Sequence, residues 1–167
     1  MKYAQIRQMD ISNGLGIGVS LYTQGCPYHC KNCFNPETWD FGAGQEWSQE
    51  QEDLVIKLLE PQYIKRLTIL GGEPLVERNI KPLERLLQRV RLTYPDKVIW
   101  LYTGGLFENE SIKHPEIFKY IDVLIDGRFV DELKDLTLAF KGSSNQRIID
   151  VQKSLIYKKV ILYDEIK

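Results

Sequence analysis

The chain lacks the features that mark several large classes of protein. No apolar run reaches the roughly 20 residues that a membrane-spanning helix needs, and no basic segment followed by an apolar stretch opens the chain as a secretory signal would. The net charge of −1 gives no broad basic surface of the kind that neutralises nucleic-acid phosphates. We therefore expect a soluble cytoplasmic protein that binds neither membrane nor nucleic acid.

Cysteine is scarce, and every cysteine lies in one short segment. Cys26, Cys30 and Cys33 form the pattern C-x3-C-x2-C, and no cysteine occurs elsewhere in the chain. An odd number of closely spaced cysteines suits disulfide pairing poorly, and a reducing compartment keeps thiols free. Such a segment is typical of a site for an inorganic centre.

The cysteine spacing leaves two kinds of centre open. Four cysteines would complete the coordination of zinc or of a cubane cluster, whereas three hold a cubane by three corners and leave the fourth iron open to a small molecule. Zinc would need His29 or His114 as its fourth ligand, and His29 lies between two of the cysteines, where tetrahedral closure is strained. The spacing alone favours an iron–sulfur cluster over zinc.

The remaining sequence predicts a single α/β domain over residues 1–167. Apolar, strand-like segments alternate with helical patterns after the cysteine segment. Strands are expected at residues 3–9, 16–22, 65–70, 98–102, 123–125 and 160–163. Helices are expected after a capping box at Ser48 and Gln51, at 80–92 and at 115–121. This alternation indicates a parallel sheet covered by helices.

The chain is short for a closed eight-stranded barrel. It has 167 residues, whereas such a barrel usually needs about 250. The segments 23–36, 71–74, 103–105 and 126–128 all follow the carboxyl ends of predicted strands, and that edge binds ligands in barrels and open sheets alike. We expect a partial, open β/α barrel with its chemistry on one edge and one side open to a large substrate.

Gly71-Gly72-Glu73-Pro74 is the second informative motif. Glycines at a strand end let the backbone approach a ligand closely and hydrogen-bond to it. A tight turn with a solvated glutamate would explain such a motif if it stood alone. Here it follows the next parallel strand after a three-cysteine segment, and this combination resembles the radical S-adenosylmethionine superfamily.

Longer strings narrow the resemblance. The segment from Gly25 to Phe41 and the strings at 70–75, 100–104, 122–127 and 142–150 are similar to the anaerobic (class III) ribonucleotide reductase activating proteins. The resemblance covers nearly the whole chain in the same order. Because the strings after Cys33 and around 143–147 are more specific than the cysteine spacing, they disfavour zinc.

This resemblance implies a radical enzyme. A 4Fe–4S cluster on Cys26, Cys30 and Cys33 would bind the amino and carboxylate groups of S-adenosylmethionine through its fourth iron. Reductive cleavage would give methionine and a 5′-deoxyadenosyl radical, which would remove hydrogen from a backbone glycine near the C-terminus of the large reductase subunit. The cofactors would supply the chemistry, so we expect no acid–base pair or nucleophile.

The resemblance also implies residues for the methionyl part of the cofactor. Gly71, Gly72 and Glu73 are expected to receive the amino group, and Thr103 is expected at the methionyl or ribose part. Asp126 and Arg128 occur where related activases hold polar groups of the cofactor. A solvated surface arginine explains Arg128 equally well.

The adenine and ribose contacts are less directly indicated. The superfamily usually has an aromatic residue just before the third cysteine, and this chain has Asn32. Backbone groups of Asn32 and Phe34 would hold the adenine edge, with stacking from Tyr28 or Phe34. The polar residues Ser143, Asn145 and Gln146 fit a loop that meets ribose or an incoming peptide, and a hydrogen-bonded turn explains each of them as well.

The implied partners are the large subunit of the anaerobic ribonucleotide reductase and a reducing system such as flavodoxin or thioredoxin. The sequence leaves open a monomer, a homodimer or a stable complex with the reductase. Two alternatives to the leading function remain. One is a radical enzyme that acts on another glycyl-radical enzyme or on a small molecule, and the other is a zinc-binding interaction module without catalysis.

Overall fold

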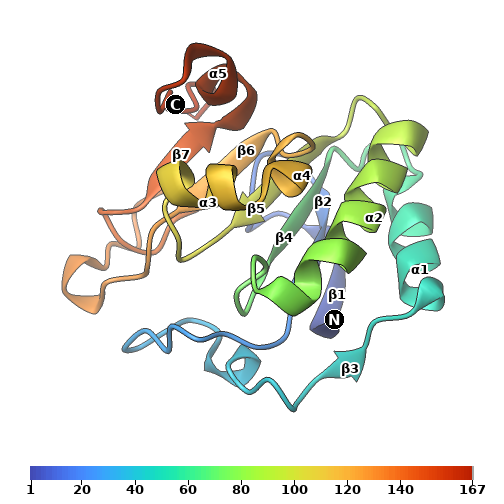
Figure 1. The fold of residues 1–167 in the computed structure, drawn as a ribbon, viewed down its shortest axis with the longest axis horizontal. Coiled ribbons are helices and arrows are strands. Elements are labelled where there is room, and N and C mark those ends of the chain that lie inside the picture. Colours follow the sequence, from blue (N-terminus) through green and yellow to red (C-terminus); the bar gives the residue numbers. More distant parts are fainter. Residues whose placement is uncertain (167) are drawn as a thin grey trace.

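The computed structural model describes residues 1–166 as a mixed α/β structure around a seven-stranded sheet (Figure 1). The strand order is β3-β1-β2-β4-β5-β6-β7. The central strands β2, β4, β5 and β6 are parallel. β1 pairs antiparallel with β2, β7 pairs antiparallel with β6, and β3 pairs antiparallel with β1. The strands are β1 (Lys2–Asp10), β2 (Gly18–Thr23), β3 (Gln45–Glu46), β4 (Arg66–Gly71), β5 (Val98–Tyr102), β6 (Val123–Asp126) and β7 (Arg147–Asp150).

The helices lie mainly between successive parallel strands. They are α1 (Gln49–Leu59), α2 (Glu77–Thr93), α3 (Phe107–Lys113), α4 (Pro115–Phe118) and α5 (Val151–Tyr157), with 3-10 turns at Pro36–Thr38 and Asp131–Leu133. Ser48 and Gln51 form the predicted capping box at the start of α1. Within residues 1–166, no helix has the length and apolar character needed to cross a membrane.

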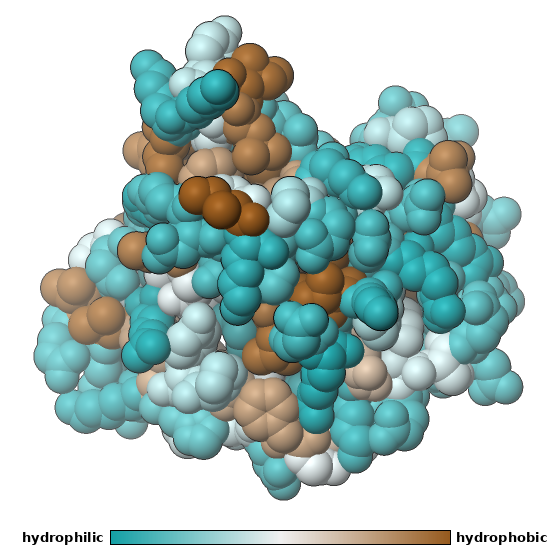
Figure 2. Space-filling model, in the orientation of Figure 1, coloured by the Kyte–Doolittle hydropathy of each residue, from teal (hydrophilic) through white to brown (hydrophobic). Residues whose placement is uncertain are grey.

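The two faces of the sheet are covered differently, because successive side chains of a strand point to opposite faces. One face, which carries Leu21, Ile69 and Leu101, packs into the main apolar core together with residues of the helices, such as Leu86. Figure 1 shows α1, α2 and α4 across this face. The outer surface over α1 and α2 is largely hydrophilic (Figure 2), as expected for amphipathic helices.

The opposite face of the sheet carries a smaller core and a buried polar network. Trp100, Val123 and Ile125 form the smaller core. The Arg66 guanidinium is fully buried and donates to the Asp10 carbonyl at 2.8 Å, while its charge lies 3.6 Å from the Asp10 carboxylate. Asp10 also accepts hydrogen bonds from the turn after β1, which it holds against this face.

Most predicted elements are confirmed, with three differences. The sheet is mixed, because both of its ends are completed by antiparallel strands. The predicted strand at 160–163 is wrong, since only Leu162 forms an isolated bridge, to Ile149. The strand beside β6 is instead β7, and the elements that were not predicted are β3, α3, β7 and α5.

Candidate cluster and cofactor site

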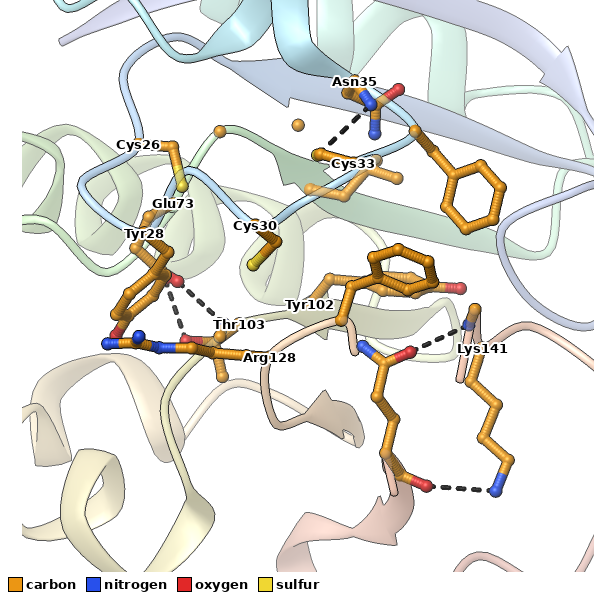
Figure 3. Close-up of a pocket in the computed structure, with 18 of the residues that line it drawn as sticks. Cys26, Tyr28, Cys30, Cys33, Asn35, Glu73, Tyr102, Thr103, Arg128 and Lys141 are labelled. Atoms are coloured by element: carbon orange, nitrogen blue, oxygen red, sulfur yellow. Dashed lines mark hydrogen bonds between the residues drawn. The ribbon is translucent and has the colours of Figure 1, made fainter. Parts of the chain in front are cut away.

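A cavity of about 560 Å³ lies where the carboxyl ends of β4, β5 and β6 meet the cysteine segment. This convergence of the predicted loops on one edge is confirmed. The predicted site residues that line the cavity are Cys26, Cys30, Cys33, Phe34, Gly71, Gly72, Glu73, Thr103, Arg128 and Gln146. Figure 3 shows the cysteine loop facing Thr103 and Arg128 across this space.

The cysteine loop, residues 24–35, follows β2 and is fixed at its base by backbone hydrogen bonds. The Gly25 amide donates to the Thr38 carbonyl at 2.7 Å, and the Cys26 amide donates to the Trp39 carbonyl at 3.1 Å. Beyond this base, His29 stacks on Trp39 with ring centroids 4.7 Å apart. The three thiols are free, so the loop presents all of them while its own ends stay anchored.

The thiols suit a metal centre better than they suit open solution. Burial raises the pKa of Cys26 and of Cys30. At Cys30 the Phe129 backbone amide offsets part of this rise, and the pKa remains raised. Thiols with a raised pKa are poor thiolates on their own, and a cationic centre stabilises their deprotonated form.

The arrangement of donors fits a cluster better than a single ion. Within residues 1–166, no three His, Cys, Asp or Glu side chains converge as the ligands of one metal ion do. The three thiols instead border a shared cavity, as the corner ligands of a multi-atom cluster must. Neither histidine considered as a zinc ligand lines this cavity. His29 stacks on Trp39 instead, and His114 lies 3.6 Å from Glu116.

Gly71 and Gly72 allow β4 to end directly against the cysteine loop. Gly71 has φ = 106°, a left-handed conformation that favours glycine, and a Cβ on Gly72 would overlap the Gly25 backbone. The Gly72 amide donates to Thr23 at 2.9 Å and the Glu73 amide donates to Gly25 at 2.8 Å. The two glycines therefore set the position of the cysteine loop itself.

Glu73 is a buried carboxylate at the centre of the site, with 4% of its surface exposed. It accepts hydrogen bonds from the Thr103 hydroxyl at 2.9 Å and from the amides of Gly104 and Leu75 at 2.8 and 3.0 Å. Burial nevertheless raises its pKa to about 7. A buried carboxylate of this kind gains most from a cationic partner in the cavity.

Tyr28 and Arg128 cover one wall of the cavity. The Arg128 guanidinium carbon lies 4.3 Å from the centre of the Tyr28 ring, and Figure 3 shows the two side chains against each other. Tyr28 also packs on Gly104, where an added Cβ would come within 2.5 Å of the ring. Burial raises the pKa of Tyr28 to about 12, so the ring stays neutral beneath the arginine.

A family model described as a 4Fe-4S single cluster domain matches residues 12–149, which include every residue that lines the cavity. The chain is 39% identical over 150 residues to the anaerobic ribonucleoside-triphosphate reductase-activating protein of Vibrio cholerae, covering 89% of this chain and 97% of that protein. The proteins of the same name from Escherichia coli K12 and phage T4 are each 38% identical over 148 residues, covering 87% and 89% of this chain and 96% and 93% of their own lengths. The chain belongs to this family.

Four residues expected at the cofactor from the resemblance to these activating proteins do not line the cavity. One is Ser143, whose buried hydroxyl accepts a hydrogen bond from the Val130 amide at 3.2 Å. Asn32 donates to Asp131 at 2.8 Å, and Asn145 donates to the Arg128 carbonyl at 2.9 Å. Asp126 is fully buried and accepts from the Phe107 amide at 2.9 Å and from Arg147. Direct contact of these four side chains with a cofactor stays a prediction, and the structure gives each of them another partner.

The cavity of this activating protein is also lined by residues that the sequence did not indicate. They include Ser12, Asn13, Tyr22, Tyr102, Leu136, Leu138, Phe140 and Lys141. Strand alternation could have identified Tyr22 and Tyr102. Residues two positions apart in a strand lie on the same face of the sheet, so each tyrosine shares a face with the residue two positions before it. No comparable signal exists for residues 136–141, which are irregular in structure.

Proposed function

We propose that the chain is a radical S-adenosylmethionine enzyme that generates the glycyl radical on the large subunit of an anaerobic ribonucleotide reductase. The observation that carries this proposal is the shared cavity of three free thiols, the Gly71–Gly72 turn and the buried Glu73. The names of the related activating proteins agree with the same target.

When bound, the 4Fe–4S cluster and S-adenosylmethionine supply the one-electron chemistry and the organic radical that removes hydrogen from a glycine. The chain's part is to hold and orient. Cys26, Cys30 and Cys33 would hold three corners of the cluster, and Glu73 would accept from the methionyl amino group. Because the Thr103 hydroxyl already donates to Glu73, Thr103 acts by fixing that carboxylate. Arg128 would reach the methionyl carboxylate from above Tyr28.

The shape of the sheet supports a partial barrel with an open side. Within residues 1–166 the sheet ends at β3 and β7, which do not pair with each other, so the cavity is walled by an arc of strands. The cavity lining includes Tyr102, Leu138 and Phe140, and these largely apolar side chains would keep water from the reacting groups. An open side admits a glycine that is carried by a large protein.

Electrons would enter from an external donor of the flavodoxin or thioredoxin type. The partial exposure of Cys30 and Cys33 supports this route, since a donor protein can come close to that edge of the loop. We further propose that the working form is a complex with the reductase, because the substrate glycine belongs to another chain.

The deciding experiment is anaerobic electron paramagnetic resonance. The reconstituted, reduced protein would be mixed with S-adenosylmethionine and the reductase large subunit from the same source. We expect a glycyl-radical doublet that disappears when any component is omitted and that is absent with Cys30→Ala. An intact, cofactor-sensitive cluster signal without the doublet would point to another glycyl-radical enzyme or a small-molecule substrate, and full cofactor cleavage by Cys30→Ala would refute the mechanism.

A further inference from the structure

The cysteine loop makes a second set of contacts, with the segment that follows β6. Asn32 lies two positions after Cys30 and one before Cys33, and its Nδ2 donates to Asp131 Oδ2 at 2.8 Å. Phe34 packs on Phe129 with ring centroids 5.1 Å apart. These contacts involve the part of the loop that lies beyond its backbone anchors at Gly25 and Cys26 and that carries Cys30 and Cys33. They therefore affect the positions of both cysteines.

The magnitudes favour the Asn32–Asp131 hydrogen bond over the ion pairs beside it. Lys31 lies 3.6 Å from Asp131 and 3.5 Å from Glu132, but its side chain is 71% exposed. Exposed pairs of this kind contribute little. The hydrogen bond from Asn32 to Asp131 is shorter, at 2.8 Å, and its acceptor is charged. Asn32 itself is exposed, but the Asp131 side chain is only 21% exposed.

The segment that carries Asp131 is itself held in place from behind. The Val130 amide donates to the buried Ser143 hydroxyl at 3.2 Å, and Asn145 and Gln146 donate to the carbonyls of Arg128 and Gly127 at 2.9 and 3.0 Å. The polar side chains of residues 143–146 thus hydrogen-bond to the backbone of residues 127–130. Asp131 therefore stands on a fixed support rather than on a free loop.

Asn32 also has the backbone conformation that this role requires. Its φ of 55° lies in the left-handed region, which asparagine tolerates better than aromatic or β-branched residues do. The side chain points out of the cavity to Asp131, and Asn32 is not among the residues that line the cavity. Asn32 occupies the position where the superfamily usually has an aromatic residue, and its side chain hydrogen-bonds to Asp131 within the chain.

We propose that Asn32 and Asp131 are positioning residues that hold the cysteine loop closed on the 127–131 segment and so fix Cys30 and Cys33 for the cluster. The proposal rests on the proposed function for its consequences, but the contact itself belongs to the chain without cofactors. Asn32 then influences S-adenosylmethionine only through the loop, and its loss and the loss of Asp131 have the same effect.

The test is a double-mutant cycle with Asn32→Ala, Asp131→Ala and the double variant, together with two controls. Glu132→Ala removes the same charge one residue away, where the side chain is 71% exposed. Asp131→Asn keeps an acceptor oxygen while it removes the charge. Hydrogen–deuterium exchange of the metal-free chain measures protection of residues 26–35, and the reconstituted protein gives the cluster midpoint potential and the dissociation constant of S-adenosylmethionine.

We expect each single alanine variant to lower the protection of residues 26–35 about fivefold, as the loss of one hydrogen bond would. The double variant should lose no more than Asn32→Ala alone, because alanine at the left-handed Asn32 adds backbone strain that Asp131→Ala lacks. Asp131→Asn should retain most of the protection, and Glu132→Ala should match the wild type. In the reconstituted protein, Asn32→Ala and Asp131→Ala should shift the midpoint potential in the same direction and weaken the cofactor equally.

Two outcomes would overturn the proposal. Additive losses of protection would show that the two side chains act independently. Weakened cofactor binding in Asn32→Ala, with wild-type binding in Asp131→Ala, would show that Asn32 touches the cofactor directly. A wild-type chain that takes up no cluster would refute the proposed function instead, and the exchange measurement on the metal-free chain would still decide whether the Asn32–Asp131 contact holds the loop.

Discussion

Glu73 is a residue whose burial opposes its charge. Its usual pKa of 4.5 rises to about 7 through burial, although hydrogen bonds from Leu75, Gly104 and Thr103 favour the ionised form. The folded chain therefore binds a proton at Glu73 more tightly than the unfolded chain does. Its contribution to the free energy of unfolding is most favourable below about pH 4.5, falls as the pH rises to about 7 and stays unfavourable above that.

We predict that this contribution can be measured as a difference between the metal-free wild type and Glu73→Gln. Because glutamine does not titrate, the unfolding free energy of wild type relative to the variant should fall by about 3 kcal/mol between pH 4.5 and pH 8. Urea denaturation across this range measures it. Glu46→Gln, at a side chain that is 76% exposed, should show no comparable change, and a flat difference for Glu73→Gln would contradict the raised pKa.

At the scale of elements, Arg147 joins β7 to β6 and α3. It donates to the fully buried Asp126 at 3.0 Å through Nε and to Glu108 at 2.8 Å through Nη2. These hydrogen bonds, with Asp126 first, raise the pKa of Arg147 above its usual value. Asp126 in turn accepts from the first amide of α3, so one ion pair fixes three elements behind the cavity.

We predict that Arg147→Met lowers the free energy of unfolding by about 3 kcal/mol, because it leaves the Asp126 carboxylate buried without a cation. Glu108→Gln, which loses only a partner that is 54% exposed, should cost less than about 1 kcal/mol. Chemical denaturation of the metal-free chain separates the two. If both variants lose equally little unfolding free energy, buried Asp126 does not depend on Arg147. Asp126 would then again be a candidate for contact with the cofactor.

The elements that the sequence predicted are those whose pattern is local. The buried apolar strands β4, β5 and β6 and the capping box of α1 follow from their own residues. The strand at the end of the sheet does not, because residues 147–150 and 160–163 are both strand-like, and only the position of the free edge of β6 selects the first. The α3 segment buries only Phe107 and so carries no helical apolar stripe.

The same distinction applies to the site. The cysteines and Gly71-Gly72-Glu73 could be predicted because their motifs are contiguous, and the structure brings them to one cavity. The partners of Asn32 and Asn145 could not, since a hydrogen bond between residues far apart in the chain depends on how the loops fold over the sheet. The sequence therefore suggested that polar residues near a motif contact a ligand. The structure shows that Asn32 and Asn145 hydrogen-bond to other parts of the chain instead.

At the scale of the whole molecule, the main core argues for a single folding unit. It runs without interruption from Tyr3 in β1 to Val151 at the start of α5 and includes all the central strands. Some apolar side chains outside this core remain exposed, among them Ile156 at 74% in α5 and Ile112 at 80% in α3. Figure 2 shows hydrophobic surface at the α5 end and in smaller areas elsewhere on the same face. Because a continuous core couples its parts, the prediction of one domain over the chain implies one cooperative transition.

We predict that scanning calorimetry of the metal-free chain shows one transition, with a van't Hoff enthalpy equal to the calorimetric enthalpy. Leu86→Ala, in the core face of α2, should lower the free energy of unfolding by about 3 kcal/mol and move the whole transition. Leu92→Ala, on the same helix at a side chain that is 79% exposed, should leave it nearly unchanged. If Leu86→Ala instead splits the transition, the strands nearest α2 unfold apart from the β6–β7 end, and the chain contains two units that share one sheet.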